Sequence, residues 1–292
     1  MTTIADMAPT KTHRGENFPV ASALIHPRHR ETILAFYRFA RASDDIADHA
    51  LLAEDEKLAR LDRMEETLLG KSDAAAAALP LRAALAKRGL APRHPQDLLT
   101  AFRLDVTKRR YRDWDDLIQY CTYSAMPVGR FVLDVHGESR ATWPANDALC
   151  AALQIINHLQ DCAADYRALD RVYIPLDALN RHGLTVEALA ADRASPQLRH
   201  CLHGLAEHTS ALLRDAQPFS TQIQDLRLSL EVSVIQRLAL KLVAMLMERD
   251  PLSERVHLSK VGVAAVSATG VAEAIGRRIA RRFAAGNKIR QA

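Results

Sequence analysis

Cysteine, glycine and aromatic residues are scarce in this chain, and no long apolar run interrupts it. The 292 residues include four Cys, 11 Gly, 12 Pro and only 5% aromatic residues. The four Cys form no CxxC pair, which favours reduced thiols over a disulfide framework. Few Gly and Pro argue against an all-β protein with many tight turns. Because uncharged runs such as 261–272 are shorter than the ~20 residues of a membrane-spanning helix, we expect no transmembrane segment.

A strong net charge and a leader sequence are missing as well. The 39 Lys and Arg exceed the 35 Asp and Glu by only four. Nucleic-acid-binding domains concentrate far more positive charge, so we expect no nucleic-acid partner. The first 19 residues contain no apolar segment of a secretory signal. We therefore expect a cytoplasmic protein, either free or peripheral at the inner face of the membrane.

Apolar residues recur at three- and four-residue spacing along most of the chain, which is typical of amphipathic helices. This pattern covers residues 27–50, 51–69, 73–87, 95–106, 114–135, 147–166, 196–214, 222–247 and 261–283. No segment alternates apolar and polar residues as a strand would. The sequence predicts an all-α fold of eight to ten helices, with one domain over residues 1–292 and a flexible N-terminus over about residues 1–15.

The first of two acidic stripes lies in the predicted helix 27–50. Tyr37, Arg41, Asp44 and Asp48 follow one another at intervals of four, three and four residues. These intervals place the four side chains along one face of a helix. Asp44 and Asp48 would lie about 6 Å apart along the axis. Such carboxylates repel each other unless a cation lies between them.

The second stripe lies in the predicted helix 147–166. Gln154, Asn157, Asp161 and Asp165 also share one face of a helix that is otherwise apolar. Burying carboxylates and amides is costly unless they are paired or bind a metal. One such acidic pair alone is most often a solvated face. Two pairs, each with polar partners in phase, favour a Mg²⁺ site that uses diphosphate oxygens as further ligands.

Two other stretches complete the pattern. Arg171 and Tyr173 follow Asp165 and offer a guanidinium and a hydroxyl to a diphosphate. Pro127 and Gly129 interrupt the predicted helix 114–135. This interruption is either a bend that opens a channel for a long apolar chain or an ordinary break between two core helices.

These motifs resemble the squalene/phytoene synthase family, the head-to-head isoprenoid synthases. The resemblance runs from about residue 17 to residue 175 and more loosely through the rest. The first aspartate motif of the family resembles Tyr37, Arg41, Asp44, Asp45 and Asp48. Its second motif, QxxNxxRDxxxD, and the RxY that follows are similar to Gln154, Asn157, Gln160, Asp161, Asp165, Arg171 and Tyr173. Its Tyr-Cys pair is similar to Tyr120 and Cys121.

The resemblance implies a single-domain isoprenoid synthase fold, a helical bundle around a central active-site cavity. It implies several Mg²⁺ ions that bridge the diphosphate, without NADPH, and the metal ligands Asp44, Asp48, Asn157, Asp161 and Asp165. Catalytic roles are implied for the four aspartates together with Tyr37 and Arg41. Substrate contacts are implied for Asn17, Phe18, Tyr37, Arg41, Tyr120, Ser124, Gln154, Asn157, Gln160, Arg171 and Tyr173.

Several departures from the general pattern indicate one bacterial branch of the family. Gln160 stands where the second motif has Arg, and Ser124 to Met126 replace the usual small residues after Tyr-Cys. Together with ENFPVAS and NHLQDCAADYRALDRVYIP, these residues resemble members that act in hopanoid pathways. They imply that presqualene diphosphate, made by a sister enzyme, is ionised and that water captures the rearranged cation to give hydroxysqualene.

Two alternatives remain open. One is condensation of two farnesyl or geranylgeranyl diphosphates to presqualene diphosphate, dehydrosqualene or phytoene. The other is a non-catalytic assembly or membrane-surface binding factor.

The small positive net charge is confined to the C-terminal tail. Residues 277–292 contain six Lys or Arg and no acid, so the rest of the chain carries 33 − 35 = −2. Cations at a helix C-terminus also suit the helix dipole. The tail is therefore either a solvated helix end or a contact with anionic membrane lipid.

Overall fold

The computed structural model describes residues 25–290, apart from the side chains of residues 274 and 277–290. The predicted flexible N-terminus, Asn17 and Phe18 lie outside the described residues. The helices are α1 (Pro27–Ala47), α2 (Glu54–Leu68), α3 (Leu79–Arg88), α4 (Arg93–Thr107), α5 (Trp114–Ser124), α6 (Met126–His136), α7 (Trp143–Leu169), α8 (Leu176–Arg181), α9 (Pro196–Asp215), α10 (Phe219–Gln222), α11 (Leu226–Glu248) and α12 (Lys260–Arg290). Short 3₁₀ turns cover Ala76–Ala78, Arg140–Thr142 and Val186–Ala190. Within the described ranges no β-strand forms, which confirms the all-α prediction.

Local sequence signals set where these helices begin and end. Asp113, Ser195 and Asp225 cap α5, α9 and α11 by accepting a hydrogen bond from the backbone N–H three residues later. Gly89 and Gly137 follow α3 and α6 in the left-handed region that favours glycine. Capping side chains and left-handed glycines therefore fix the ends of these helices.

The interrupted stretch 114–135 forms two helices, which confirms the second interpretation of Pro127 and Gly129, a break between two core helices. α5 ends at Ser124 and α6 begins at Met126, with Pro127 in the first turn of α6. Proline is tolerated there because the N–H that it lacks would have no partner inside the helix. A side-chain Cβ on Gly129 would lie 1.9 Å from Asn146 Oδ1 on α7. Glycine thus permits the close approach of α6 and α7.

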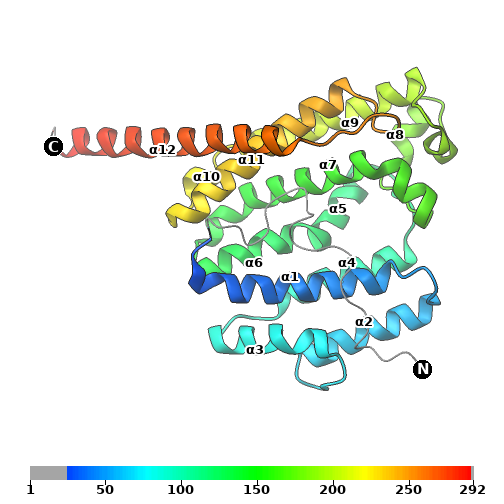
Figure 1. The fold of residues 1–292 in the computed structure, drawn as a ribbon, viewed down its shortest axis with the longest axis horizontal. Helices are drawn as coiled ribbons and strands as arrows, with labels where there is room; N and C mark the ends of the chain where they lie inside the picture. The colour runs from blue at the N-terminus through cyan, green and yellow to red at the C-terminus, as the bar shows by residue number, and fades with distance from the viewer. Residues whose placement is uncertain (1–24, 291–292) are drawn as a thin grey trace.

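The helices stack in layers, as Figure 1 shows, with α2 and α3 at one end and α9, α11 and the start of α12 at the other. α6 lies in the middle and packs against α1, α4, α5 and α7. One apolar cluster includes residues of α1 to α4, and a second includes residues of α7, α9 and α11. The two helices with acidic stripes, α1 and α7, therefore belong to different apolar clusters.

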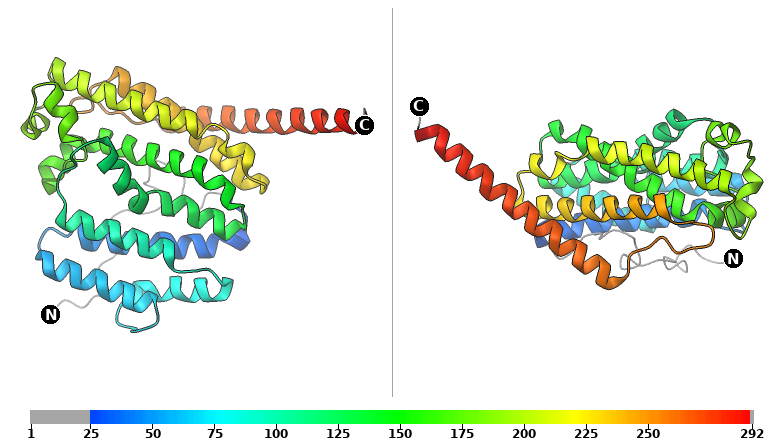
Figure 2. Two further views of the ribbon diagram at one scale, coloured as in Figure 1. Left: turned by 180° about the vertical axis from the view of Figure 1, so that it is seen from behind. Right: turned by 90° about the horizontal axis from the view of Figure 1, so that it is seen from above.

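The C-terminal helix α12 packs along α11 and then projects beyond the body of the protein (Figures 1 and 2). The predicted basic tail forms the projecting end. In the part of the chain that the structure describes, no helix has the length and apolar character needed to cross a bilayer.

Candidate active site

The first acidic stripe lies at the C-terminal end of α1. Asp44 is in the last turn, and Asp48 caps the helix with its backbone N–H bonded to the Asp44 carbonyl. Arg41 donates to Asp44 Oδ2 at 2.6 Å and to Asp45 Oδ1 at 3.3 Å. Tyr37 lies half-buried two turns before Asp44. The predicted alignment along one helix is confirmed.

The second stripe lies at the C-terminal end of α7. Asp161 and Asp165 occupy its last turns, and α7 stops at Asp170, whose φ of 49° lies in the left-handed region. The chain then runs extended beside residues 109–112. The Val172 N–H donates to the Arg109 carbonyl. This pairing fixes Arg171 and Tyr173 beside the site.

An arginine joins the two stripes, which are far apart in the sequence. Arg171 Nη1 donates to Asp48 Oδ1 at 3.0 Å, so the segment after α7 contacts the end of α1. Burial and the charges of Asp161 and Asp48 raise the pKa of Asp165 to about 7, although Arg171 opposes the shift. Burial and the Asp48 charge also raise the pKa of Asp44 to about 7, although Arg41 opposes the shift. The carboxylates of the two motifs are therefore close enough for the charge of one to raise the pKa of another.

Asp105 on α4 is the residue of this site that the sequence reasoning missed. It is 8% exposed. Its carboxylate accepts hydrogen bonds from the Tyr120 hydroxyl, at 2.9 Å to each oxygen, and from the Tyr173 hydroxyl at 2.8 Å. Arg171 donates to its backbone carbonyl at 2.8 Å. Asp105 shares the buried face of α4 with Leu98 and other apolar residues, and an acid on such a face was the available signal.

Aromatic rings surround this carboxylate. Tyr173 stacks on His158 with ring centroids 3.5 Å apart, and its ring centroid lies 5.4 Å from that of Tyr120. Tyr111 packs against both tyrosines with centroids 5.3 Å away. Burial lowers the pKa of His158 to about 3, so the imidazole is neutral. The neutral imidazole adds no positive charge to the cluster, whereas the Tyr111 ring has the Lys108 ammonium 4.5 Å from its centroid.

The other predicted site residues occupy α5 and α7. The Gln154 side chain is 3.1 Å from His158 Nε2, and Asn157 lies half-buried one turn before Asp161. Gln160 is buried and donates its amide to the Val256 carbonyl, on the segment between α11 and α12. At the end of α5, Ser124 Oγ is buried without a hydrogen-bond partner among the described residues.

The donor set suits Mg²⁺, which takes one or two carboxylates together with waters and phosphate oxygens. Repulsion among buried carboxylates is what a divalent cation would relieve. Within residues 25–290, no three His, Cys, Asp or Glu side chains form a complete metal site by themselves.

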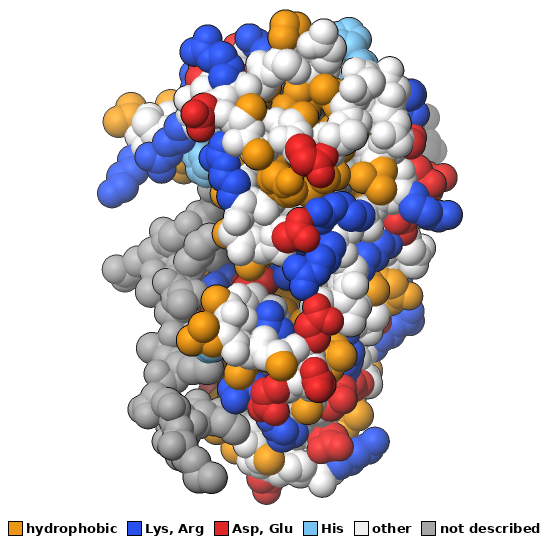
Figure 3. Space-filling view, turned by 90° about the vertical axis from the view of Figure 1, so that its right-hand side faces the viewer, with side chains coloured by type: hydrophobic (Ala, Val, Ile, Leu, Met, Phe, Trp, Pro, Cys, Tyr) orange, Lys and Arg blue, Asp and Glu red, His pale blue; other side chains and the backbone are white. Residues whose placement is uncertain are grey.

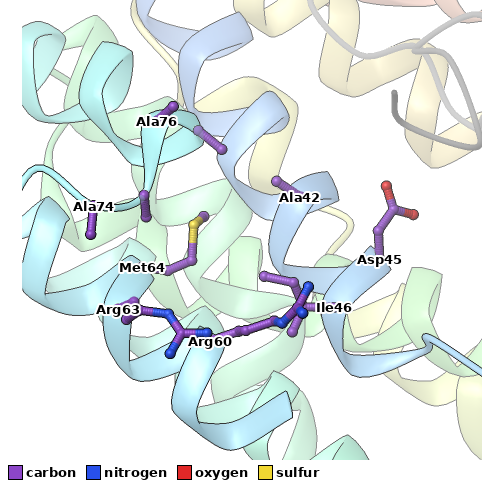
Figure 4. A pocket seen from close by; sticks show the side chains of 10 residues that line it. Ala42, Asp45, Ile46, Arg60, Arg63, Met64, Ala74 and Ala76 are labelled. Carbon is purple, nitrogen blue, oxygen red and sulfur yellow. The ribbon is translucent and has the colours of Figure 1, made fainter. Parts of the chain in front are cut away.

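The side of the molecule where α1 and α7 end has charged side chains of both signs across its middle (Figure 3). A separate hollow, open to solvent, lies between α1, α2 and the turn before α3 (Figure 4). Short alanine side chains at residues 74–77 leave this space, and Asp45 and Arg60 also line it. This hollow lies beside the acidic stripe of α1 and lacks the residues of α7.

An all-α fold in which two helices end in aspartates, with Arg171 from the segment after one helix on Asp48 of the other, fits an enzyme class that acts on isoprenoid diphosphates. The sequence model of the squalene/phytoene synthase family matches residues 11–262, and the chain belongs to this family. The resemblance inferred from the motifs is therefore confirmed.

Individual relatives agree with this assignment. The chain is 58% identical over 278 residues to a hydroxysqualene synthase of Rhodopseudomonas palustris, which covers 95% of each chain. It is 51% identical over 265 residues to a hydroxysqualene synthase of Zymomonas mobilis, and this match covers 89% of each chain. The crystal structure of squalene synthase HpnC from Alicyclobacillus acidocaldarius superimposes with a TM-score of 0.70 at 29% identity, over 78% of this chain and 87% of that one. A dehydrosqualene synthase at 20% identity and TM-score 0.76 supports the fold alone.

Proposed function

We propose that this protein is a hydroxysqualene synthase. It ionises presqualene diphosphate, lets the cyclopropylcarbinyl cation rearrange, and captures the product cation with water to give hydroxysqualene and diphosphate. The high identity to hydroxysqualene synthases over 95% of the chain supports the reaction. The observation on which the site assignment rests is the contact of Arg171 with Asp48, which joins the two acidic motifs.

The diphosphate end of the substrate binds between the C-terminal ends of α1 and α7. Asp44, Asp48, Asn157, Asp161 and Asp165 would hold the ions. Bound Mg²⁺ would neutralise the charge that develops on the departing diphosphate. Arg41 keeps Asp44 and Asp45 in place through its two hydrogen bonds. A substrate phosphate that takes over a guanidinium would release these acids toward the ions.

The cation forms beside the aromatic cluster. The ring face of Tyr120 attracts positive charge, and a cation–π contact contributes roughly 0.5–2 kcal/mol. One face of Tyr173 is covered by His158. The neutral state of His158 matters because a protonated imidazole there would repel the cation. Because water ends the reaction, no hydride donor such as NADPH is needed.

The way in which the substrate arrives and the product leaves indicates which partners this protein has. Presqualene diphosphate is an amphiphile with a long apolar chain, so we infer transient contact with the synthase that makes it and with membrane lipid. The projecting end of α12 supports the lipid contact, since residues 277–292 hold six basic residues and no acid.

To test this proposal, the purified protein is incubated with Mg²⁺ and either presqualene diphosphate or farnesyl diphosphate, and the products are identified. We expect hydroxysqualene from the first and no product from the second. Asp44→Ala and Asp161→Ala should abolish turnover, while the exposed Asp215→Ala on α9 serves as the matched control. Turnover of farnesyl diphosphate alone would instead indicate condensation, and turnover of neither would indicate a binding factor. Full activity of Asp44→Ala and Asp161→Ala would contradict the site.

A further inference from the structure

A buried carboxylate and two tyrosines form one hydrogen-bonded unit beside the substrate site. The Tyr120 and Tyr173 hydroxyls both donate to Asp105, at 2.8 to 2.9 Å. A tyrosine hydroxyl has one proton to donate. Since both hydroxyls donate to Asp105, each hydroxyl oxygen offers only lone pairs to a further partner, and that of Tyr173 already accepts from Arg171 Nη1 at 3.4 Å. These two tyrosines are therefore hydrogen-bond acceptors toward a bound molecule.

A third tyrosine in the same cluster has a donor to spare. Tyr111 is fully buried, and its ring packs against those of Tyr120 and Tyr173. Its hydroxyl has no hydrogen-bond partner within the described part of the chain. Buried hydroxyls of this kind are normally satisfied by an internal water. The cluster thus combines a spare donor on Tyr111 with acceptor lone pairs on Tyr120, the two kinds of group that a bound water needs.

The unit of Asp105, Tyr120 and Tyr173 lies next to the end of α1, where the proposed function places the diphosphate. Arg171 spans the distance, with Nη1 on Asp48 and Nη2 on the backbone carbonyl of Asp105. The tyrosine cluster and the first acidic motif are thus one side chain apart. A water held by the cluster would lie close to the rearranged cation.

We propose that the three tyrosines hold the water that captures the carbocation, and that Asp105 receives the proton which this water releases. The inference rests on the proposed function. A lone pair of the water oxygen forms the new C–O bond with the cationic carbon. One water proton passes to the Tyr120 or Tyr173 oxygen as the hydroxyl proton of that tyrosine passes to Asp105. The products are a neutral alcohol and a protonated Asp105, which later returns its proton to solvent.

The electrostatics of Asp105 suit this role. Burial raises the pKa of this carboxyl to about 6, while Arg171 and the two tyrosine hydroxyls oppose the shift. Asp48 raises the same pKa from across Arg171. A base with a pKa just below neutral is ionised at neutral pH and still binds a proton readily.

The experiment measures two quantities for each variant with presqualene diphosphate and Mg²⁺: released diphosphate, and the share of alcohol among the products. Tyr120→Phe, Tyr173→Phe and Asp105→Asn break the unit, and Tyr166→Phe on α7 is the matched control. In Asp105→Asn and Tyr120→Phe we expect the alcohol share to fall roughly tenfold or more. Hydrocarbon formed by proton loss from the same cation should replace it. Asp105→Glu should recover part of the alcohol share, and Tyr166→Phe should leave it unchanged.

Each outcome has one meaning. An unchanged alcohol share in variants that still release diphosphate would overturn the inference. Folded variants that release no diphosphate would place the unit in ionisation instead of capture, and would also overturn it. The phenylalanine variants keep the ring packing, so they decide the matter if Asp105→Asn does not fold. Failure of the unmodified protein to convert presqualene diphosphate would refute the proposed function itself.

Discussion

The repulsion among the aspartates makes a measurable prediction about stability. Replacing Asp165 by Asn removes a charge that the folded protein holds beside Asp161 and Asp48 but keeps the shape of the side chain. The pKa of Asp165 is about 7 in the folded protein, against an ordinary value of 3.8. We therefore expect Asp165→Asn to stabilise the metal-free protein at alkaline pH, and to do so at the cost of activity.

The sign and size follow from proton linkage. The folded state binds the Asp165 proton more tightly than the unfolded chain. The stability of the unmodified protein therefore falls as the pH rises from about 4 to about 7, and stays constant above that range. A pKa difference of this size corresponds to about 4 kcal/mol. Asp165 is only half-buried, so solvent screening reduces the expected gain to about 1–2 kcal/mol. In a domain of this size that is roughly 2–8 °C in melting temperature.

The assay is thermal unfolding of both proteins near pH 8 and near pH 5, with EDTA or with MgCl₂ plus inorganic diphosphate. In EDTA the variant should melt higher than the unmodified protein near pH 8, with a smaller difference near pH 5. Mg²⁺ and diphosphate should raise the melting temperature of the unmodified protein more than that of the variant. Asp215→Asn is the control for charge removal alone. Equal melting of the two proteins in EDTA near pH 8, or equal stabilisation by Mg²⁺, would refute the reasoning.

Three further predictions concern packing, the bridging arginine and the tail. Gly129→Ala should lower the free energy of unfolding by about 1–3 kcal/mol in a denaturant titration, because its Cβ would meet Asn146; Gly204→Ala, which meets nothing within 4 Å on α9, should not. Arg171→Lys should lower kcat/KM by roughly 10- to 100-fold in steady-state assays, because an ammonium cannot reach Asp48 and the Asp105 carbonyl together. A chain that ends at Gly276 should lose binding to anionic liposomes in a sedimentation assay but keep its activity on dispersed substrate. Unchanged liposome binding would contradict the proposed membrane contact.

The sequence was sufficient to predict the fold because helix periodicity is a local property. The acidic stripes lie on α1 and α7, as their spacing predicts, and the family assignment follows from the same residues. The break at Ala125 was harder to place, since a proline inside a helical pattern fits either a kink or the first turn of a new helix. The structure distinguishes them because α6 must approach α7 closely at Gly129.

Contacts between distant segments could not be read from spacing. Gln160 is the clearest case: its position in the second motif indicates a substrate contact, but its amide donates to the Val256 carbonyl, 96 residues away. Gln160 lies next to Asp161 in α7, but consecutive residues of a helix point to different faces. Which of these side chains points at the ligand depends on α11 and the segment after it. Helical periodicity carries no information on that packing.

Asp105 is a functional candidate that spacing patterns could not identify, because it is an isolated acid. It belongs to no aspartate pair and lies in the apolar stripe of α4, where an isolated acid is an unfavourable choice unless something compensates for its burial. The compensation comes from Tyr120 on α5 and from Arg171 and Tyr173 after α7. Two separate segments, α5 and the stretch after α7, therefore supply the partners of one carboxylate. A buried charge that these partners neutralise only in part, with a pKa still raised to about 6, costs stability and needs a functional reason. Taking up a proton beside a cation-forming site is such a reason.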